Sequence, residues 1–284
     1  MLATDIPTLA ALAALGSAMS HACVALFTKR SKDTLVFRAL SLGLSAVWLT
    51  PILFLMPFPS WEVWRFLLLG CAIIWAFNML MISAFERGDM NLVYPVMRGA
   101  APTLAGTLAW FVLDERLSLV AVGGLATASA AIIAFSWPER SGAPKAAAIA
   151  FALCAAVMTA LYTVNDASGV RAAGSPLVYL AWHFWLSALT LCVTALVRRK
   201  SQIVVAVKGE FRTAFAISFF NITTYGLALY AYANAPVAPI AALRETSIVF
   251  GAILAAVVLK EPFGMKRGVL AGVLVLGLVA LQLG

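Results

Sequence analysis

The chain has 284 residues, of which 63% are hydrophobic and only 11% are charged, and its mean hydropathy is +0.97. A soluble domain of this length would be charged at roughly a quarter of its positions. The composition therefore excludes a water-soluble fold. The net charge of +8 indicates membrane orientation rather than nucleic-acid binding, because basic clusters with interleaved aromatic residues are confined to short loops.

Ten apolar segments are long enough to cross the hydrocarbon core as helices, which takes about 20 residues each. Turn-forming or charged residues separate them, and none shows the short alternating pattern of barrel strands. The sequence thus predicts an all-α integral membrane protein with ten transmembrane helices. In chain order they are Ile6–Phe27, Leu35–Phe58, Val63–Phe85, Leu92–Leu113, Ser118–Trp137, Lys145–Asn165, Pro176–Val197, Phe211–Ala233, Val237–Leu259 and Lys266–Leu283.

The connections are too short for a soluble domain, and the longest, Arg198–Glu210, is expected to form at most an amphipathic piece on the surface. Lys and Arg give the orientation, because they accumulate on the cytoplasmic side. Fifteen of the 20 follow the odd-numbered segments, with Arg38 counted among these loop residues, and three lie on the opposite side. This bias predicts an integral protein of the inner (cytoplasmic) membrane with both termini non-cytoplasmic.

The fourth and ninth segments repeat the same pattern. Each contains an arginine, Arg98 or Arg244; the acidic pair Asp114-Glu115 follows the first segment, and Lys260-Glu261 follows the second. A shift of 146 residues places Arg98 on Arg244 and Glu115 on Glu261 without a gap. Because each unit would hold five helices, an odd number, the second unit enters the membrane the other way up. The sequence therefore predicts two inverted-topology repeats, and we assign them to residues 1–137 and 138–284.

The two arginines are candidate substrate ligands. A guanidinium inside an apolar helix is costly, so its presence at matched positions indicates a function. At 1.5 Å per residue each lies roughly 10 Å in from its own membrane face, and inverted-repeat transporters bind substrate near the midplane. Guanidinium groups stay charged and form bidentate pairs with carboxylate or phosphate. The alternative for Arg98 and Arg244 is an internal ion pair or hydrogen bonds to helix carbonyls.

Glu245 is the clearest acid within a predicted span. Successive residues point about 100° apart on a helix, so Glu245 is expected to pair across helices rather than with Arg244. If it faces a cavity, it is a candidate proton carrier, although a nearby arginine would oppose that role.

Further polar and aromatic residues should point inward, because polar atoms facing lipid would lack partners. They could shape a substrate cavity or simply hydrogen-bond between helices. Prolines near the arginines are candidate kink or gating positions, and a GxxxG pair in the last helix predicts close packing, within the protein or in a homodimer. The cavity candidates are His21, Trp75, Asn78, Tyr94, Tyr162 and Tyr225; the prolines are Pro95, Pro102 and Pro239; the glycines are Gly268 and Gly272.

No catalytic or metal-binding motif is present. The four cysteines form no CxxC pair, there are only two histidines, and neither HExxH nor GxSxG occurs. We therefore expect no enzyme activity, no cofactor and no metal. The expected partners are a small-molecule substrate and the lipid bilayer, not nucleic acid.

Two stretches resemble a known family. Residues 88–102 with Leu113-Asp114-Glu115-Arg116-Leu117-Ser118 resemble the fourth-helix signature of EamA-type members of the drug/metabolite transporter superfamily, in which a helix containing proline precedes Glu-Arg-Leu. Ala238-Pro239-Ile240 through Leu259-Lys260-Glu261-Pro262 is similar to a second copy.

This resemblance implies ten helices in two inverted repeats. It also implies a relation to exporters of amino acids and other metabolites, which are often presumed to exchange for protons. The family commonly has both termini in the cytoplasm, whereas the charge bias predicts the reverse, and we follow the charge bias.

The leading hypothesis is a secondary transporter that exports amino acids or other carboxylate-bearing amphipathic solutes by alternating access. The first alternative is an exporter of organic cations, but that mechanism relies on an acid in the first helix, and Ile6–Phe27 contains none. An intramembrane enzyme and a non-transporting scaffold are the remaining alternatives.

Overall fold

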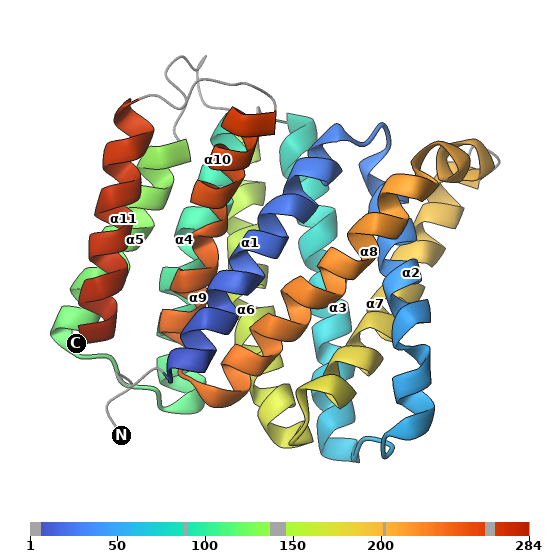
Figure 1. The fold of residues 1–284 in the computed structure, drawn as a ribbon, viewed down its shortest axis with the longest axis horizontal. Helices are drawn as coiled ribbons and strands as arrows, with labels where there is room; N and C mark the ends of the chain where they lie inside the picture. Colours follow the sequence, from blue (N-terminus) through green and yellow to red (C-terminus); the bar gives the residue numbers. More distant parts are fainter. Residues whose placement is uncertain (1–6, 88–89, 137–145, 201–202, 259–264, 284) are drawn as a thin grey trace.

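The computed structural model of the chain describes residues 7–87, 90–136, 146–200, 203–258 and 265–283. Within these ranges the protein is all-helical, without strands, and its helices form a bundle (Figure 1). The helices are α1 (Thr8–Arg30), α2 (Thr34–Leu55), α3 (Trp61–Arg87), α4 (Met90–Leu113), α5 (Leu119–Ser136), α6 (Ala146–Ala173), α7 (Pro176–Arg199), α8 (Ile203–Asn234), α9 (Val237–Glu245), α10 (Ser247–Val258) and α11 (Met265–Leu283).

Seven helices of the described ranges, α1 to α4 and α6 to α8, are long and apolar enough to cross a membrane. The fifth and tenth predicted segments form α5 and α11, whose apolar stretches, Leu119–Ala134 and Gly268–Leu281, are shorter. The ninth predicted segment is divided at Thr246 into α9 and α10. Helices satisfy their own backbone hydrogen bonds, as lipid requires. The protein is therefore a multi-pass membrane protein.

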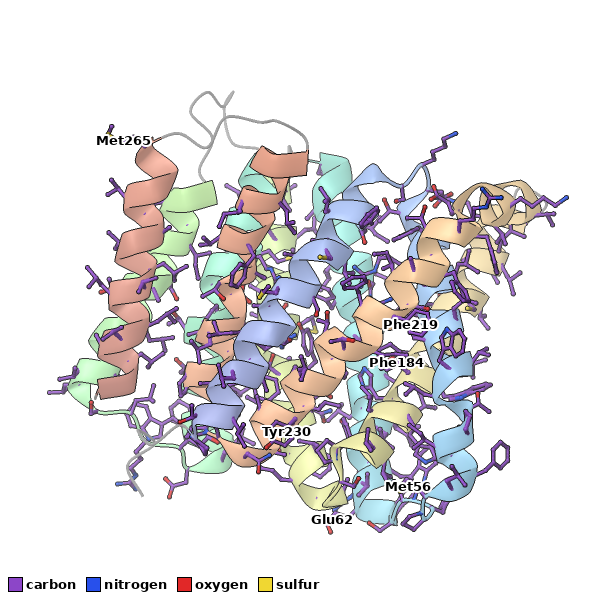
Figure 2. The ribbon with its side chains drawn as sticks, viewed as in Figure 1. Met56, Glu62, Phe184, Phe219, Tyr230 and Met265 are labelled. Atoms are coloured by element: carbon purple, nitrogen blue, oxygen red, sulfur yellow. The ribbon has the colours of Figure 1, made fainter. Side chains whose placement is uncertain are left out.

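The outer surface of the bundle is apolar. Phe54, Phe111 and Leu119 are each at least 80% exposed, and Figure 2 shows side chains such as Met265 projecting away from the helices. A soluble protein would not leave so many large apolar groups in water. This surface is the face that the bilayer covers.

Small residues allow the inner helices to pack closely. On α1, Ala10, Ala14, Ala18 and Ala22 recur every fourth residue and are at most 2% exposed. This stripe lies on a helix that packs against α8, α9 and α10. Such small-residue stripes allow backbones to approach in a membrane. The other main packing pairs are α3 with α6, α5 with α11, α2 with α7, and α4 with α5, α6 and α9.

Two predicted boundaries differ clearly from the structure, and one residue that was counted with a loop lies in a helix. Helix α6 continues to Ala173, well past the predicted end at Asn165, so Asp166 lies inside it. Helix α8 starts at Ile203, so part of the stretch expected to lie on the surface belongs to α8. Arg38, counted as a loop residue, lies in α2. At Asp166 and Glu210 a charge in the sequence resembles the end of a span, whereas the folded bundle brings hydrogen-bond donors to it.

Charged contacts join segments at both ends of the bundle. At one end Asp33 accepts hydrogen bonds from the N–H groups of Leu35 and Val36, which caps α2, and pairs with Arg199 Nε at 2.6 Å. Burial raises the pKa of Asp33, but the hydrogen bonds from Arg199 and the cap outweigh it and hold the pKa below its ordinary value. The carboxylate of Glu210 accepts from the Lys32 N–H at 2.7 Å.

At the other end Glu115, in the loop after α4, contacts two later helices. It pairs with Arg171 of α6 at 2.9 Å and accepts from the N–H of Val237, the first residue of α9, at 2.6 Å. Arg171 also donates to the carbonyls of Tyr232 and Ala235. Glu115 thus satisfies a free N–H at the start of α9 and holds α6 beside it.

Candidate functional site

Arg98 contacts the interruption between α9 and α10. Its guanidinium donates to Glu245 Oε1 at 3.2 Å and to Ser247 Oγ at 3.3 Å, and these acceptors flank Thr246. The Thr246 hydroxyl donates to the Leu243 carbonyl at 2.6 Å, which satisfies a carbonyl at the end of α9. The interruption therefore presents a carboxylate and a hydroxyl to α4.

Arg244 turns toward other helices. Its Nε donates to Ser17 Oγ on α1 at 3.2 Å, and its Nη1 donates to the Tyr232 hydroxyl on α8 at 3.1 Å. Its charge also lies 5.7 Å from the centre of the Tyr232 ring, within the range of a cation–π contact. Adjacent Glu245 faces α4 instead. The expectation that Glu245 pairs across helices is confirmed.

A third arginine belongs to the same centre. His21 interacts electrostatically with Arg98, Arg244 and Arg38. Tyr162 interacts with Arg98, Arg244 and Glu245, and also with Arg38. The Nε atom of Arg38 is buried and has no hydrogen-bond partner among the described residues. We call Arg38, Arg98, Arg244, Glu245, His21 and Tyr162 the arginine centre.

The charges of this centre do not balance within the described part of the chain. Guanidiniums remain protonated in proteins. Glu245 pairs with Arg98 and lies near Arg244, and both partners of the ion pair are largely buried, while Arg38 brings a third guanidinium close to His21 and Tyr162. Such an excess of buried positive charge is costly unless an anion completes it. The centre is therefore suited to an anionic group.

The other residues considered from the sequence lie in different surroundings. Trp75 donates from its indole N–H to Thr194 Oγ1 at 3.2 Å, and its side chain is 44% exposed on the outside of α3. Asn78 is buried but donates to the Ile74 carbonyl of its own helix. Tyr225 binds Asp166 rather than an arginine. Tyr162 makes an edge contact with the Phe77 ring besides its place in the arginine centre.

The prolines occupy contrasting positions. Pro102 is buried in the interior of α4, which continues through it. Pro239 is buried in the first turn of α9, where its missing N–H breaks no helical hydrogen bond. The side chains of Tyr94 and Pro95, both in α4, lie outside the described residues.

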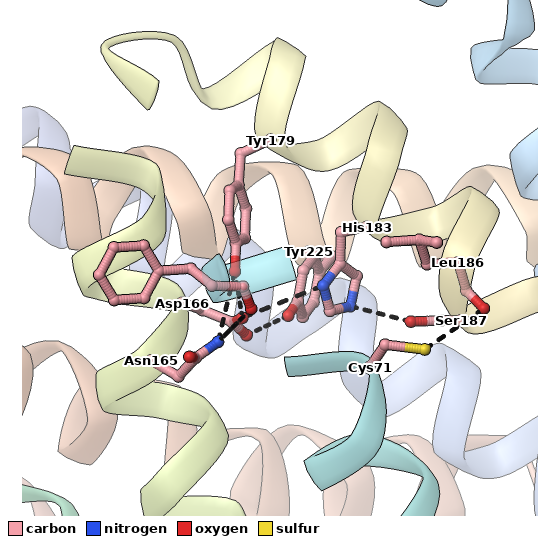
Figure 3. A network of polar contacts seen from close by, with 9 residues as sticks. Cys71, Asn165, Asp166, Tyr179, His183, Leu186, Ser187 and Tyr225 are labelled. Atoms are coloured by element: carbon pink, nitrogen blue, oxygen red, sulfur yellow. Dashed lines mark hydrogen bonds and ion pairs between the residues drawn. The ribbon is translucent and has the colours of Figure 1, made fainter. Parts of the chain in front are cut away.

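A second polar cluster joins α6, α7 and α8. The carboxylate of Asp166, in a residue only 2% exposed, accepts from the Tyr179 hydroxyl at 2.9 Å and from the Tyr225 hydroxyl (Figure 3). Asn165 lies 3.5 Å from the same carboxylate and donates to the Phe66 carbonyl of α3 at 2.9 Å. Neutral donors from three helices therefore surround one buried acid.

His183 completes this cluster. Its Nδ1 lies 4.0 Å from Asp166 Oδ1, its Nε2 lies 3.3 Å from Ser187 Oγ, and its ring stacks on Tyr225 at 4.5 Å (Figure 3). The Nδ1 atom is buried and has no hydrogen-bond partner among the described residues. We call Asn165, Asp166, Tyr179, His183, Tyr225 and Ser187 the aspartate network.

Two glycines let the helices close around the network. A Cβ at Gly169 would lie 2.4 Å from the Tyr179 ring, and a Cβ at Gly70 would lie 2.8 Å from Asn165 Nδ2. Larger residues at these positions would displace the groups that bind Asp166. The sequence places glycine where the aromatic ring and the amide must approach the backbone of α6 and α3.

Sequence reasoning did not identify Asp166, Tyr179 or Arg38 as site residues. One signal for Asp166 is present in the chain. Tyr162, Asn165, Asp166 and Gly169 occur at spacings of three, four and seven, which places them on one face of a helix that continues past Asn165. Arg38 offers no comparable signal, because a basic residue close to a loop usually stays in water.

Comparison with known proteins gives a family for the second half of the chain. The EamA-like transporter family matches residues 146–282, from α6 to α11. No curated protein matches the chain significantly. A solved structure described as "Crystal structure of protein" superposes with a TM-score of 0.79 over 96% of this chain and 98% of its own, at 15% identity, which shows a shared fold alone. Residues 146–282, slightly less than half of the chain, are thus similar to the EamA-like transporter family, and together with the apolar helical fold this match supports a membrane transporter of the drug/metabolite transporter type.

Proposed function

We propose that the protein is a secondary transporter that exports amino acids or other small carboxylate-bearing solutes by alternating access. The observation that carries the proposal is the arginine centre, where Arg98 and Arg244 flank Glu245 and the Arg38 Nε atom is buried without a hydrogen-bond partner among the described residues. A substrate carboxylate would offset the excess positive charge and form the bidentate contacts that guanidinium groups favour. The proposed ligands are Arg38, Arg98 and Arg244, with His21 and Tyr162 beside them.

In this proposal Glu245 is an internal counter-ion. It holds one nitrogen of Arg98 at 3.2 Å, and its Oε2 atom is buried without a hydrogen-bond partner among the described residues. A substrate carboxylate that takes its place on Arg98 would leave Glu245 buried and unpaired. A buried unpaired carboxylate favours its protonated form, so substrate binding and the protonation state of Glu245 would be linked.

The packing pairs support two inverted repeats, residues 1–137 and 138–284. In the proposed repeats, α1, α2, α3, α4 and α5 correspond in that order to α6, α7, α8, α9–α10 and α11. The contact of α1 with α8 is then equivalent by symmetry to the contact of α6 with α3. The contact of α4 with α6 is likewise equivalent by symmetry to the contacts of α1 with α9 and α10. In three further contacts, α2 with α7, α4 with α9 and α5 with α11, a helix packs against its own counterpart in the other repeat. This is expected where a two-fold symmetry axis passes between the two helices.

Contacts between the proposed repeats at both ends support alternating access. Glu115, from the first repeat, holds Arg171 and the start of α9 in the second. At the opposite end Asp33 holds Arg199 in the same way. Rocking of one repeat against the other would break the contacts at one end and keep those at the other. The prolines of α4 and α9, Pro95, Pro102 and Pro239, are the proposed points of bending.

Orientation and assembly complete the proposal. The start of α1 and the end of α11 lie at one end of the bundle, opposite the ends of α1 and α7 (Figure 1), where the chain carries the basic residues Arg30, Arg198 and Arg199. This supports non-cytoplasmic termini in an inner membrane. Gly268 and Gly272 are exposed on α11, and a Cβ at either would meet nothing within 4 Å, so this open face could receive a second copy in a homodimer.

Counterflow in proteoliposomes tests the substrate class. Purified protein is loaded with amino acids, organic anions or organic cations in turn, and exchange of the labelled solute is measured. We expect exchange of a carboxylate-bearing solute, and we expect Arg244→Ala to lower it at least tenfold. Arg212→Ala, at an exposed position of α8, is the matched control.

Two results would contradict the proposal. One is exchange of organic cations alone by the wild type. The other is a well-folded Arg244→Ala variant that exchanges every carboxylate solute as fast as the control. Gel filtration and the apparent melting temperature establish that the variant is folded.

A further inference from the structure

We propose that Asp166 and His183 form a proton-binding site, distinct from the arginine centre, in which the proton is held on His183 Nδ1 facing the Asp166 carboxylate, and that this site couples transport to a proton gradient. The coupling rests on the proposed transport function. The binding of the proton does not, and it can be tested on the purified protein alone.

The hydrogen bonds of His183 leave one nitrogen available. When the neutral ring carries its hydrogen on Nε2, that N–H can donate to Ser187 Oγ at 3.3 Å. The other nitrogen, Nδ1, then carries a lone pair. It is buried without a hydrogen-bond partner in the described ranges of the chain, and it lies 4.0 Å from Asp166 Oδ1. A proton taken up at Nδ1 would point at a carboxylate that a small side-chain movement brings into contact.

The charge of the pair favours this step. Without the proton, Asp166 is a single negative charge inside an apolar bundle, and no Lys or Arg of the described residues forms an ion pair with it. The hydroxyls of Tyr179 and Tyr225 and the Asn165 amide stabilise that charge. With the proton on His183, the pair is neutral. The site therefore has two defined states that differ by one proton.

The groups around the pair are defined on every helix that packs against it. Helix α3 contributes the Phe66 carbonyl, Gly70 and the Cys71 thiol, which lies against the Leu186 carbonyl. Helices α7 and α8 contribute the tyrosine hydroxyls and Ser187. The charges on α2, α4 and α9 act on Tyr162, one turn before Asp166 on α6; they are Arg38, Arg98, Arg244 and Glu245.

A short path joins this site to the arginine centre. Tyr225 donates a hydrogen bond to Asp166 and lies near Tyr162. Tyr162 in turn interacts with Arg98 and Arg244, and it lies one helical turn from Asp166, so the two side chains share a face of α6. A change of charge at Asp166 and His183 would therefore change the electrostatic potential close to Arg98 and Arg244, which are proposed ligands of the substrate carboxylate.

Nitrogen-15 NMR of histidine-labelled protein tests proton binding. The chain has two histidines, so His21→Gln and His183→Gln assign both signals. We expect the His183 signal to change from imidazole to imidazolium as the pH is lowered between 8 and 5. In Asp166→Asn the same change should require a proton concentration at least ten times higher, because the imidazolium loses its negative partner.

The wild-type spectrum decides the matter even if Asp166→Asn does not fold. A His183 ring that stays neutral throughout this pH range overturns the proposal, and so does an unchanged titration in a folded Asp166→Asn variant. Gly70→Ala is the matched control for packing, since it disturbs Asn165 without removing a titratable group.

Proteoliposomes with an imposed pH gradient test the coupling. The quantity measured is the ratio of gradient-driven uptake to counterflow exchange of the same solute. We expect Asp166→Asn and His183→Gln to lower this ratio at least fivefold. An unchanged ratio in both variants, or wild-type uptake that does not respond to the pH gradient, contradicts the coupling. If no solute exchanges at all, the proposed function fails while the NMR result stands by itself.

Discussion

The arginine centre and the aspartate network lie one turn apart on α6, yet their electrostatics are opposite. The arginine centre gathers three guanidiniums, and its buried donor Arg38 Nε has no hydrogen-bond partner among the described residues. The aspartate network surrounds one carboxylate with neutral donors, and in the same part of the chain the buried His183 Nδ1 atom has no hydrogen-bond partner. An excess of fixed cations suits an anion, whereas an acid beside an imidazole suits a proton. Adjacent sites on one helix can thus be suited to different ligands.

The largest expected effect is that of Asp166→Leu. The change removes the acceptor of two buried tyrosine hydroxyls, Tyr179 and Tyr225, and each unsatisfied buried donor costs about 1–3 kcal/mol. We expect a loss of roughly 3 kcal/mol in the free energy of unfolding, measured as a lower apparent melting temperature in detergent. Glu62→Leu, an exposed acid at the end of the bundle (Figure 2), is the control. Equal melting temperatures for the two variants would show that the network does not stabilise the fold.

Glu245→Gln should strengthen ligand binding at the arginine centre. It removes the carboxylate that competes for Arg98, so we expect the affinity for the most stabilising carboxylate solute to rise about tenfold, equivalent to about 1.4 kcal/mol. Titration of the solute in a thermal-shift assay measures it. Arg98→Gln should weaken binding instead. Weaker binding in Glu245→Gln would mean that Glu245 itself contacts the substrate. The arginine centre would then use an acid in ligand binding, as the aspartate network does, and the two sites would differ less than their charges suggest.

A third prediction concerns the contacts that hold both sites in place. Glu115→Ala removes an ion pair with Arg171 and the acceptor at the start of α9. We expect a loss of about 1–2 kcal/mol in stability, as for other capping residues, and a shift in which end of the bundle is open. Cysteine accessibility at the loop before α9 measures the second effect. Glu115→Gln, which keeps an acceptor oxygen, should retain part of both.

The smallest effect is expected at Asp33, outside the membrane-spanning helices. Its pKa is lower in the folded protein than its ordinary value, so its stabilising effect is present above that ordinary value and is lost as the pH falls through the folded pKa. We expect Asp33→Ala to lose about 1 kcal/mol at pH 7 and progressively less below pH 4. Asp33→Asn keeps a capping side chain and should lose less. A constant difference between wild type and Asp33→Ala at all pH values would contradict this.

This surface carboxylate is also a reference for the two buried sites. A pH dependence of stability that disappears in Asp33→Ala arises at the end of the bundle. A pH dependence that survives in Asp33→Ala but disappears in Asp166→Asn arises in the aspartate network. The pair of variants thus separates an exposed titration from a buried one.

The sequence by itself determined the membrane class, the approximate places of the apolar segments, and the presence of costly arginines at matched positions. These properties follow from local quantities, because hydropathy and charge cost depend on each residue and its near neighbours. The direction of Glu245 away from Arg244 was equally predictable, since helix geometry alone fixes it.

Only the tertiary structure decided which polar groups meet. Arg98 finds Glu245 and Ser247 nearly 150 residues away, and Asp166 is tolerated inside α6 because hydroxyls from α7 and α8 reach it. In the sequence both Asp166 and Arg38 resembled the edge of a span. A buried charge is stable only with partners, and those partners come from helices that are distant in the chain, so no local pattern could reveal them.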